Sequence, residues 1–244
     1  MPRFFVDKTD ITDSTARIIG DDARHIARSL RMAVGDSVTV CDGEGREYDT
    51  VLSRIRDEEC VCEIKEEIKS RCESPVRITL CMAYPKGDKL ETVIQKAVEL
   101  GVDTVVPFES SRCIKRPPKE KLEKLTARHT KIAEEAAKQC GRAKLPRVLS
   151  PLSFAEMLNI TKEASLTLFC YENEDGTTLK SALLNAGSIK DIAIIIGCEG
   201  GFSPDEAKAA ISAGAISVSL GSRILRCETA PAYVLSALSY VFEL

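Results

Sequence analysis

The sequence predicts an α/β protein in two parts, a small β-barrel-like unit over residues 1–72 and a larger domain with a parallel sheet over residues 73–244. Three observations lead to this fold class. Short β-rich runs separated by Gly and Asp turns fill the first part. From about residue 75 onward, strands alternate with helices. The later strands are continuous apolar runs, which is typical of parallel strands covered on both faces.

The first part contains β-branched and aromatic runs bounded by turn residues, with one helical stretch among them. The predicted strands are 3–6, 16–19, 36–42, 46–55 and 59–68, and the predicted helix is 21–32. Short strands with this turn spacing are typical of a small barrel.

The second part repeats a strand-then-helix order from residue 76 to the end. The predicted strands are 76–84, 104–110, 165–171, 191–197 and 216–221. The predicted helices are 89–101, a long basic helix within 111–147, 178–187, 204–214 and 228–244. Ligands of open parallel sheets bind where strands end and loops lead into helices, so the loops after these strands are the candidate site.

Composition excludes several classes of protein. The chain has 244 residues, 44% of them hydrophobic and 29% charged, which suits a globular protein with a sizeable core. No apolar run approaches the ~20 residues of a membrane span, and the N-terminus lacks a signal peptide, so we expect a cytoplasmic protein with no membrane partner. Ten cysteines occur without a Cys-x-x-Cys pair and with only two histidines, which predicts reduced core thiols and no metal site.

Charge is distributed unevenly along the chain. Residues 111–147 carry 12 basic and 4 acidic side chains, although the whole protein has a net charge of −3. A local excess of this kind attracts a polyanion such as RNA. A solvated helix with Glu and Lys pairs is the alternative interpretation.

The run "IIIGCEGGFSPDEAKAA", residues 194–210, places a glycine-rich turn directly after a predicted buried strand. In this turn, 197–201, missing Cβ atoms would let a ligand touch the backbone. Ser203 and Pro204 then begin a helix whose first turn has two acids. Those acids disfavour phosphate, so a neutral or cationic ligand fits better. The alternative is a turn that only packs strand against helix.

A second segment, "SVSLGSRILRCETAPAYVLSAL" at residues 217–238, has a similar layout. After a strand and Gly221, the apolar Ile224 and Leu225 stand in a short loop next to Arg226, before the last helix. Apolar loop residues flanked by arginines are typical of the lining of a ligand pocket.

Taken together, "IGCEGGFS" and "LGSRILRCETA", with "KGDKLETVIQKAVELGV" and "KIAEEAAKQCGR" upstream, resemble the small-subunit ribosomal RNA (uracil-N3)-methyltransferases, the RsmE family of the SPOUT superfamily. The resemblance spans nearly the whole chain. It implies an N-terminal PUA-like β-barrel, a C-terminal α/β domain tied in a trefoil knot, S-adenosylmethionine as the methyl donor with S-adenosylhomocysteine as product, and a homodimer. A knot contradicts the general rule that chains do not thread loops.

The resemblance also implies which residues hold the cofactor. They are Phe169, Tyr171, Glu172, Ile196, Gly197, Glu199, Gly200, Leu220, Gly221, Ile224, Leu225 and Arg226. Cys198 stands where the family usually has proline, so the turn loses some rigidity while its backbone contacts remain possible.

Methylation of uridine N3 requires removal of its proton or stabilisation of the uridine anion. We expect Arg226, beside the cofactor loop, to stabilise the developing negative charge. Glu199 is the carboxylate most available as a general base, although a structural role in its tight glycine turn is the preferred alternative.

RNA binding is expected on the basic helix and on the barrel, as the resemblance implies. The expected RNA-binding residues are Arg3, His25, Arg28, Arg31, Arg128, Lys131, Gln139 and Arg142. The partner would be ribosomal RNA or the small ribosomal subunit. Two other functions stay open, a knotted ribose 2′-O-methyltransferase and an RNA-binding assembly factor without chemistry. The intact glycine turns disfavour the assembly factor.

Overall fold

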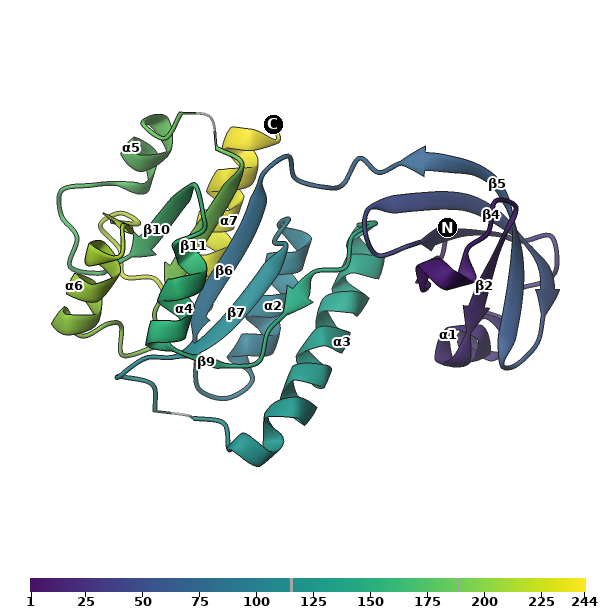
Figure 1. Ribbon diagram of the computed structural model, residues 1–244, viewed down its shortest axis with the longest axis horizontal. Coiled ribbons are helices and arrows are strands. Elements are labelled where there is room, and N and C mark those ends of the chain that lie inside the picture. Colours follow the sequence, from purple (N-terminus) through teal and green to yellow (C-terminus); the bar gives the residue numbers. More distant parts are fainter. Residues whose placement is uncertain (115, 188) are drawn as a thin grey trace. The chain divides into compact units, whose positions relative to one another are not determined.

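The computed structural model describes residues 1–114, 116–187 and 189–244. The chain forms two compact units, and each unit consists of two segments that are separated in the sequence. Unit 1 consists of Met1–Glu73 and Ala137–Leu145, and unit 2 of Ser74–Ala136 and Pro146–Leu244 (Figure 1).

Unit 1 is built on a five-stranded sheet in the order β1-β3-β4-β5-β2. Its strands are β1 (Arg3–Phe5), β2 (Thr15–Ile19), β3 (Ser37–Cys41), β4 (Arg46–Ile55) and β5 (Glu59–Lys69). Neighbouring strands are antiparallel except β1 and β3, which run parallel. The long β4–β5 pair has two register shifts, and such irregularities bend a strand and increase its twist.

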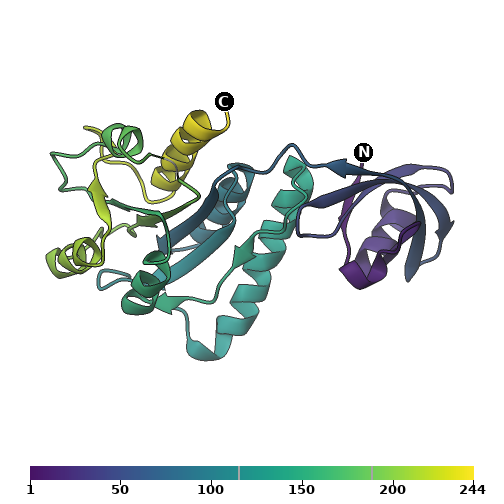
Figure 2. The same cartoon turned by 45° about the horizontal axis from the view of Figure 1, so that its top comes forward.

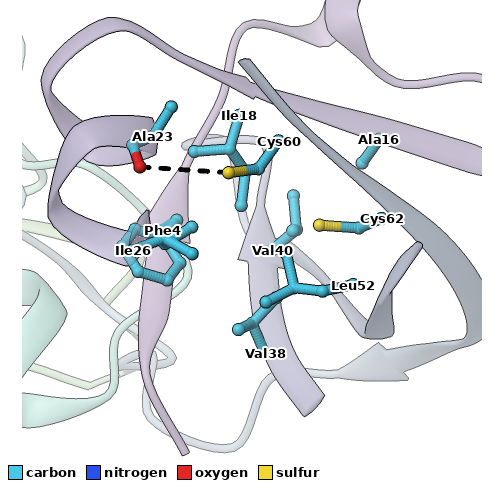
Figure 3. Packing of buried hydrophobic residues seen from close by; sticks show 10 residues of the cluster. All are labelled: Phe4, Ala16, Ile18, Ala23, Ile26, Val38, Val40, Leu52, Cys60 and Cys62. Atoms are coloured by element: carbon cyan, nitrogen blue, oxygen red, sulfur yellow. Dashed lines mark hydrogen bonds between the residues drawn. The ribbon is translucent and has the colours of Figure 1, made fainter. Parts of the chain in front are cut away.

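The core of unit 1 lies between this curled sheet and a short helical segment (Figure 3). Cys60 and Cys62 alternate along β5, so both side chains point into the core, as the sequence pattern predicts. The helical segment comprises α1 (Gly20–Arg24) and η2 (His25–Ser29), a turn of π-helix. It contributes Ala23 and Ile26 to the core, and the carbonyl of Ala23 accepts a hydrogen bond from the Cys60 thiol at 3.9 Å. A short 3-10 turn, η1 (Lys8–Asp10), also belongs to unit 1, and a second one, η3 (Lys119–Lys121), belongs to unit 2.

Unit 2 contains a parallel sheet whose main path runs β12-β10-β11-β6-β7-β8. Its strands are β6 (Arg77–Ala83), β7 (Thr104–Glu109), β8 (Arg147–Val148), β9 (Leu152–Ser153), β10 (Leu166–Cys170), β11 (Asp191–Ile196) and β12 (Ile216–Val218). β11 lies between β10 and β6 and is buried from residue 192 to residue 196. The predicted α/β class with a parallel sheet is therefore confirmed.

The helices that accompany this sheet in the described part of the chain are α2 (Lys89–Glu99), α3 (Leu122–Cys140), whose end belongs to unit 1, α4 (Phe154–Thr161), α5 (Leu179–Leu184), α6 (Pro204–Ser212) and α7 (Thr229–Phe242). Figure 1 and Figure 2 show α2 and α7 side by side on one face of the sheet, where the two helices pack together. Among the described residues, no helix is both long enough and apolar enough to cross a membrane.

Candidate active site

The carboxyl ends of three neighbouring strands define the candidate site in unit 2. β10 pairs in parallel with β11 on one side and with β12 on the other, so the chain leaves all three strands at one edge of the sheet. The segments that follow enclose a cleft of about 710 Å³. Its lining residues are Cys170, Tyr171, Glu172, Glu174, Asp175, Ile196, Gly197, Cys198, Glu199, Gly200, Gly201, Ser219, Leu220, Gly221, Ser222, Arg223, Ile224, Leu225, Arg226, Cys227 and Ala230.

Residues 197–201, the first bend, form a tight turn in which the Gly201 N–H donates to the carbonyl of Cys198 at 3.0 Å. Gly201 has φ = 62°, and a Cβ there would lie 2.0 Å from a carboxylate oxygen of Glu172. The conformation of this residue therefore favours glycine, and a larger residue would also have to displace the Glu172 carboxylate. A Cβ on Gly200 would lie 3.0 Å from the Cβ of Arg112, whose guanidinium donates to the Gly200 carbonyl at 3.0 Å. The first bend thus presents bare backbone to the cleft.

Residues 221–226, the second bend, follow β12. Two backbone hydrogen bonds fix Ser219, which lies just before the bend. Its N–H donates to the carbonyl of Thr177 at 2.8 Å, and its carbonyl accepts from the backbone N–H of Leu179 at 3.0 Å. Gly221 has φ = 106°, a backbone conformation that favours glycine. Ile224 is 92% exposed although it lines the cleft. An exposed isoleucine at the edge of a cleft suits contact with an apolar ligand surface.

Glu199 in the first bend is bound to the segment that follows β6. Its carboxylate accepts a hydrogen bond from the backbone N–H of Lys86 at 3.3 Å and lies 3.0 Å from the ammonium of Lys89. Partial burial tends to raise the pKa of Glu199, but the hydrogen bonds from its own backbone N–H, from Lys89 and from Lys86 lower it overall. Glu199 is therefore held as a structural carboxylate, and a lowered pKa makes it a weaker base.

The charges around the cleft favour a cation. The cleft is lined by four acidic residues, Glu172, Glu174, Asp175 and Glu199, and by two basic residues, Arg223 and Arg226. These last two residues belong to the second bend. Among the described residues, no hydrogen bond or ion pair to the Arg226 guanidinium is found, so this group is available to an anion that enters the cleft.

Two thiols meet beneath the first bend. Ser110 Oγ lies 3.3 Å from Cys113 Sγ and 3.7 Å from Cys198 Sγ, and all three residues are buried. Hydrogen bonding between the two cysteines lowers the pKa of Cys198, assisted by the backbone N–H of Gly200, and raises the pKa of Cys113. Cys198, at the position where the resemblance implies proline, therefore ties the first bend to the segment after β7.

Eleven of the twelve cofactor residues that the resemblance implies line this single cleft. The exception is Phe169, which is fully buried; its ring lies 5.4 Å from Tyr171 and 4.6 Å from Phe202, between centroids. Phe169 supports the wall from behind. The cofactor roles themselves stay predictions, but the expected residues converge on one site.

Sequence reasoning missed several residues of the cleft. Glu174 and Asp175 follow β10 directly, and Lys89 and Glu228 hold the bends from outside. The acidic run "ENED" after the strand at 165–171 was the available signal for the first two. Lys89 carried no such signal, since its partners are distant in the sequence.

The expected RNA-binding residues fall into two groups. His25, Arg28, Arg31, Arg128, Lys131 and Gln139 are exposed. Arg142, in contrast, is 2% exposed, and its guanidinium binds the carboxylate of Glu73 at 2.9 Å within unit 1. Arg3 is partly buried and binds Glu47 at 2.6 Å. Arg142 and Arg3 thus have structural roles in unit 1, whereas RNA binding by the exposed group stays a prediction.

Comparison with known proteins defines the class. An RNA methyltransferase domain family matches residues 72–239, and an RNA methyltransferase PUA domain family matches residues 18–65. The parallel sheet with its cleft belongs to the first family, and the curled sheet of unit 1 to the second. The chain is therefore a member of the RNA methyltransferase family with an N-terminal PUA domain.

Particular relatives resemble this chain over nearly all of its length. The chain is 34% identical to ribosomal RNA small subunit methyltransferase E of Bacillus subtilis, covering 100% of this chain and 98% of the relative. It is 31% identical to the enzyme of the same name from Synechocystis, covering 99% of this chain and 78% of the relative. The crystal structure of ribosomal RNA small subunit methyltransferase E from Neisseria gonorrhoeae, bound to S-adenosylmethionine, matches with a TM-score of 0.87 and 31% identity, covering 99% of this chain and 98% of that one.

Proposed function

We propose that this protein transfers a methyl group from S-adenosylmethionine to N3 of a uridine in the RNA of the small ribosomal subunit. The observation that carries the proposal is the cleft at the ends of β10, β11 and β12, which is lined by the glycine-rich first bend and by the second bend with its apolar and basic side chains. Family membership and the small-subunit methyltransferases among the relatives support the class of reaction.

The residues of the cleft fit this methyl donor. The first bend offers backbone N–H and carbonyl groups to the ligand, because Gly200 and Gly201 carry no side chains. Ile224 and Leu225 of the second bend offer an apolar surface for the adenine ring. The acids that line the cleft suit a sulfonium cation. S-adenosylmethionine, when bound, supplies an electrophilic methyl carbon.

The chain's own contribution to the reaction is orientation and charge stabilisation. Methyl transfer is an in-line displacement, so holding the uridine nitrogen near the methyl carbon supplies much of the rate. The Arg226 guanidinium would stabilise the negative charge that develops on the uridine ring as the N3 proton leaves. Glu199 is not proposed as the base, because Lys89 and Lys86 already bind its carboxylate and its pKa is lowered.

Unit 1 would contribute to RNA binding through exposed basic residues such as Arg31. We further propose a homodimer in the cytoplasm, with α7 at the subunit interface. The exposed Tyr233 and Tyr240 on this helix support that location. Threading of the last segment as a knot remains an expectation from the resemblance.

Calorimetric titration of S-adenosylmethionine into the purified protein tests the cofactor site. The wild-type protein should bind, and Gly200→Val should not, since its side chain would collide with Arg112 and displace the first bend. The variant should keep its affinity for RNA. The control variant is Lys208→Ala. Lys208 is exposed on α6 and does not line the cleft, so this variant should bind the donor like the wild type. Undiminished binding by Gly200→Val would overturn the pocket assignment.

The product identifies the reaction. Small-subunit RNA from cells with and without the protein is compared by reverse transcription and by mass spectrometry of nucleosides. Methylation at N3 blocks the pairing edge of uridine and stops reverse transcription at one position. A ribose 2′-O-methyltransferase would instead leave a nucleotide that resists alkaline cleavage, and an assembly factor would leave no methylated nucleotide. Either of these two results would refute the proposed reaction.

A further inference from the structure

A single lysine connects the two halves of the cleft. Lys89 is the first residue of α2, and its ammonium lies 3.0 Å from the carboxylate of Glu199 and 3.2 Å from that of Glu228. Glu199 belongs to the first bend, and Glu228 follows the second bend as the residue that precedes α7. Lys89 itself does not line the cleft.

Lys89, Glu199 and Glu228 form a charge network in which the ammonium lies between the two carboxylates. The Cys227 thiol donates to Glu228 at 3.2 Å and lies 3.9 Å from the Lys89 ammonium, so it is the remaining titratable group of the network. All three charged side chains are between one quarter and one third exposed. Without the ammonium, two carboxylates would face each other at the junction of the two bends, and like charges repel.

We propose that Lys89 is a positioning residue for the methyl donor: by bridging Glu199 and Glu228 it fixes the separation of the two bends that enclose the cleft. Lys89 touches neither donor nor RNA and acts through the two glutamates. The inference rests on the proposed function, because it assigns this separation to donor binding.

The pH dependence follows from the same contacts. At Glu199, burial is the largest single influence and raises the pKa, but hydrogen bonds and the Lys89 charge together lower it overall. At Glu228, hydrogen bonds and the Lys89 charge lower the pKa, and burial opposes them less. Both carboxylates are therefore ionised in the wild type at pH 5 and above, and the network does not change charge between pH 5 and pH 8. If Lys89 loses its charge, the facing carboxylates hold a proton more tightly, so their pKa values rise toward this range.

Lys89→Met tests the proposal, because it keeps an unbranched side chain and removes the charge. Calorimetry should give a dissociation constant for S-adenosylmethionine about tenfold higher than that of the wild type at pH 8, as expected when a coupled charge network loses a member. In steady-state methylation the KM for the donor should rise while kcat changes little. Lys96→Met is the matched control, since Lys96 lies on the same helix and pairs with Glu99 at 2.9 Å.

Two further measurements separate positioning from a general loss of structure. The tenfold difference in dissociation constant between Lys89→Met and the wild type should become smaller as the pH falls from 8 to 5. At the lower pH, a proton shared by the two carboxylates replaces the missing positive charge. The double variant Lys89→Met with Glu228→Gln should recover part of the affinity, and so should Lys89→Arg. If Lys89→Met is unstable, Lys89→Arg and Glu228→Gln carry the test alone.

The outcomes distinguish this inference from the proposed function. Failure of the wild-type protein to bind S-adenosylmethionine would refute the function. Binding by the wild type with an equal dissociation constant for Lys89→Met would refute the positioning role alone. A deficit that is independent of pH and unrelieved by Glu228→Gln would do the same.

Discussion

Arg142 was expected to contact RNA, and instead it is buried in unit 1. Its guanidinium binds one carboxylate oxygen of Glu73, while the other oxygen accepts the backbone N–H groups of Ala143 and Lys144 at 2.9 and 3.0 Å. Glu73 therefore fixes the end of the segment 137–145. The position of an arginine in a basic stretch of sequence does not establish an RNA contact, because charge along the sequence does not show whether the side chain is buried.

Removal of this arginine should destabilise unit 1. Arg142→Met leaves the partly buried carboxylate of Glu73 without its cation, and breaking such a pair costs about 3–5 kcal/mol of unfolding free energy. Urea denaturation followed by circular dichroism measures the loss. Arg147→Met, at an exposed arginine a few residues further on, should change stability little. Equal midpoints for the two variants would contradict the assigned role.

Other residues of the site were predictable because their reason is local. Backbone conformation favours glycine at positions 201 and 221, and close packing favours it at positions 197 and 200. A cluster of glycines is visible in the sequence itself. Lys89 was not predictable in this way, since its partners Glu199 and Glu228 come together only when α2 packs against α7. Interactions across the sheet depend on strand order, which periodicity does not give.

Helix α3 carries several of the exposed basic residues of the second unit. Lys131 is exposed, whereas His129 on the same helix is 2% exposed and packs inward. Arg128 is already paired with Glu91 at 2.8 Å. Of these residues, Lys131 is thus best placed to meet an RNA phosphate.

Charge reversal at this position should weaken RNA binding. Lys131→Glu is expected to lower affinity and to reduce the slope of log K against log salt by about one, since one phosphate contact releases about one counterion. Filter binding at several salt concentrations measures this slope. Lys208→Glu on α6 makes the same change in net charge and should leave the slope unchanged. If both variants behave alike, the effect is one of overall charge and α3 is not the RNA surface.

Most elements were predictable from periodicity, and the exceptions have physical reasons. Except for β8 and β9, the strands of both units lie where apolar periodicity placed them, and so do helices α2, α5, α6 and α7. Ser203 caps α6 with its partner Glu206, as the sequence predicts. The two-residue strands β8 and β9 are too short to show a period. Helix α4 was missed although Ser153 and Glu156 form a capping box at its start, a signal that was readable.

At the scale of the whole molecule, the proposed dimer has a specific surface. Tyr233 and Tyr240 are 44% and 74% exposed and lie two helical turns apart on α7, so they share one face. Exposed aromatic residues on one face are enriched at protein interfaces.

Sedimentation equilibrium should therefore give twice the chain mass of 26.7 kDa. Tyr240→Glu should shift the equilibrium toward the monomer, because an unpaired charge would be buried in the interface. Ile211→Glu, at a comparably exposed apolar residue of α6, should not. A monomeric wild-type protein would exclude the dimer.

The way in which the chain passes between its two units restricts how the protein can be divided. The chain crosses from one unit to the other after Glu73, after Ala136 and again after Leu145. A protease that cut only after residue 73 would break the backbone there, but residues 1–73 would still pack against segment 137–145 of the other fragment, so the two fragments should stay associated until they are denatured. Truncation of the first 73 residues would leave Arg142 without the carboxylate of Glu73 and segment 137–145 without the rest of its compact unit, so a shortened protein of this kind should expose surface that is buried in the full chain.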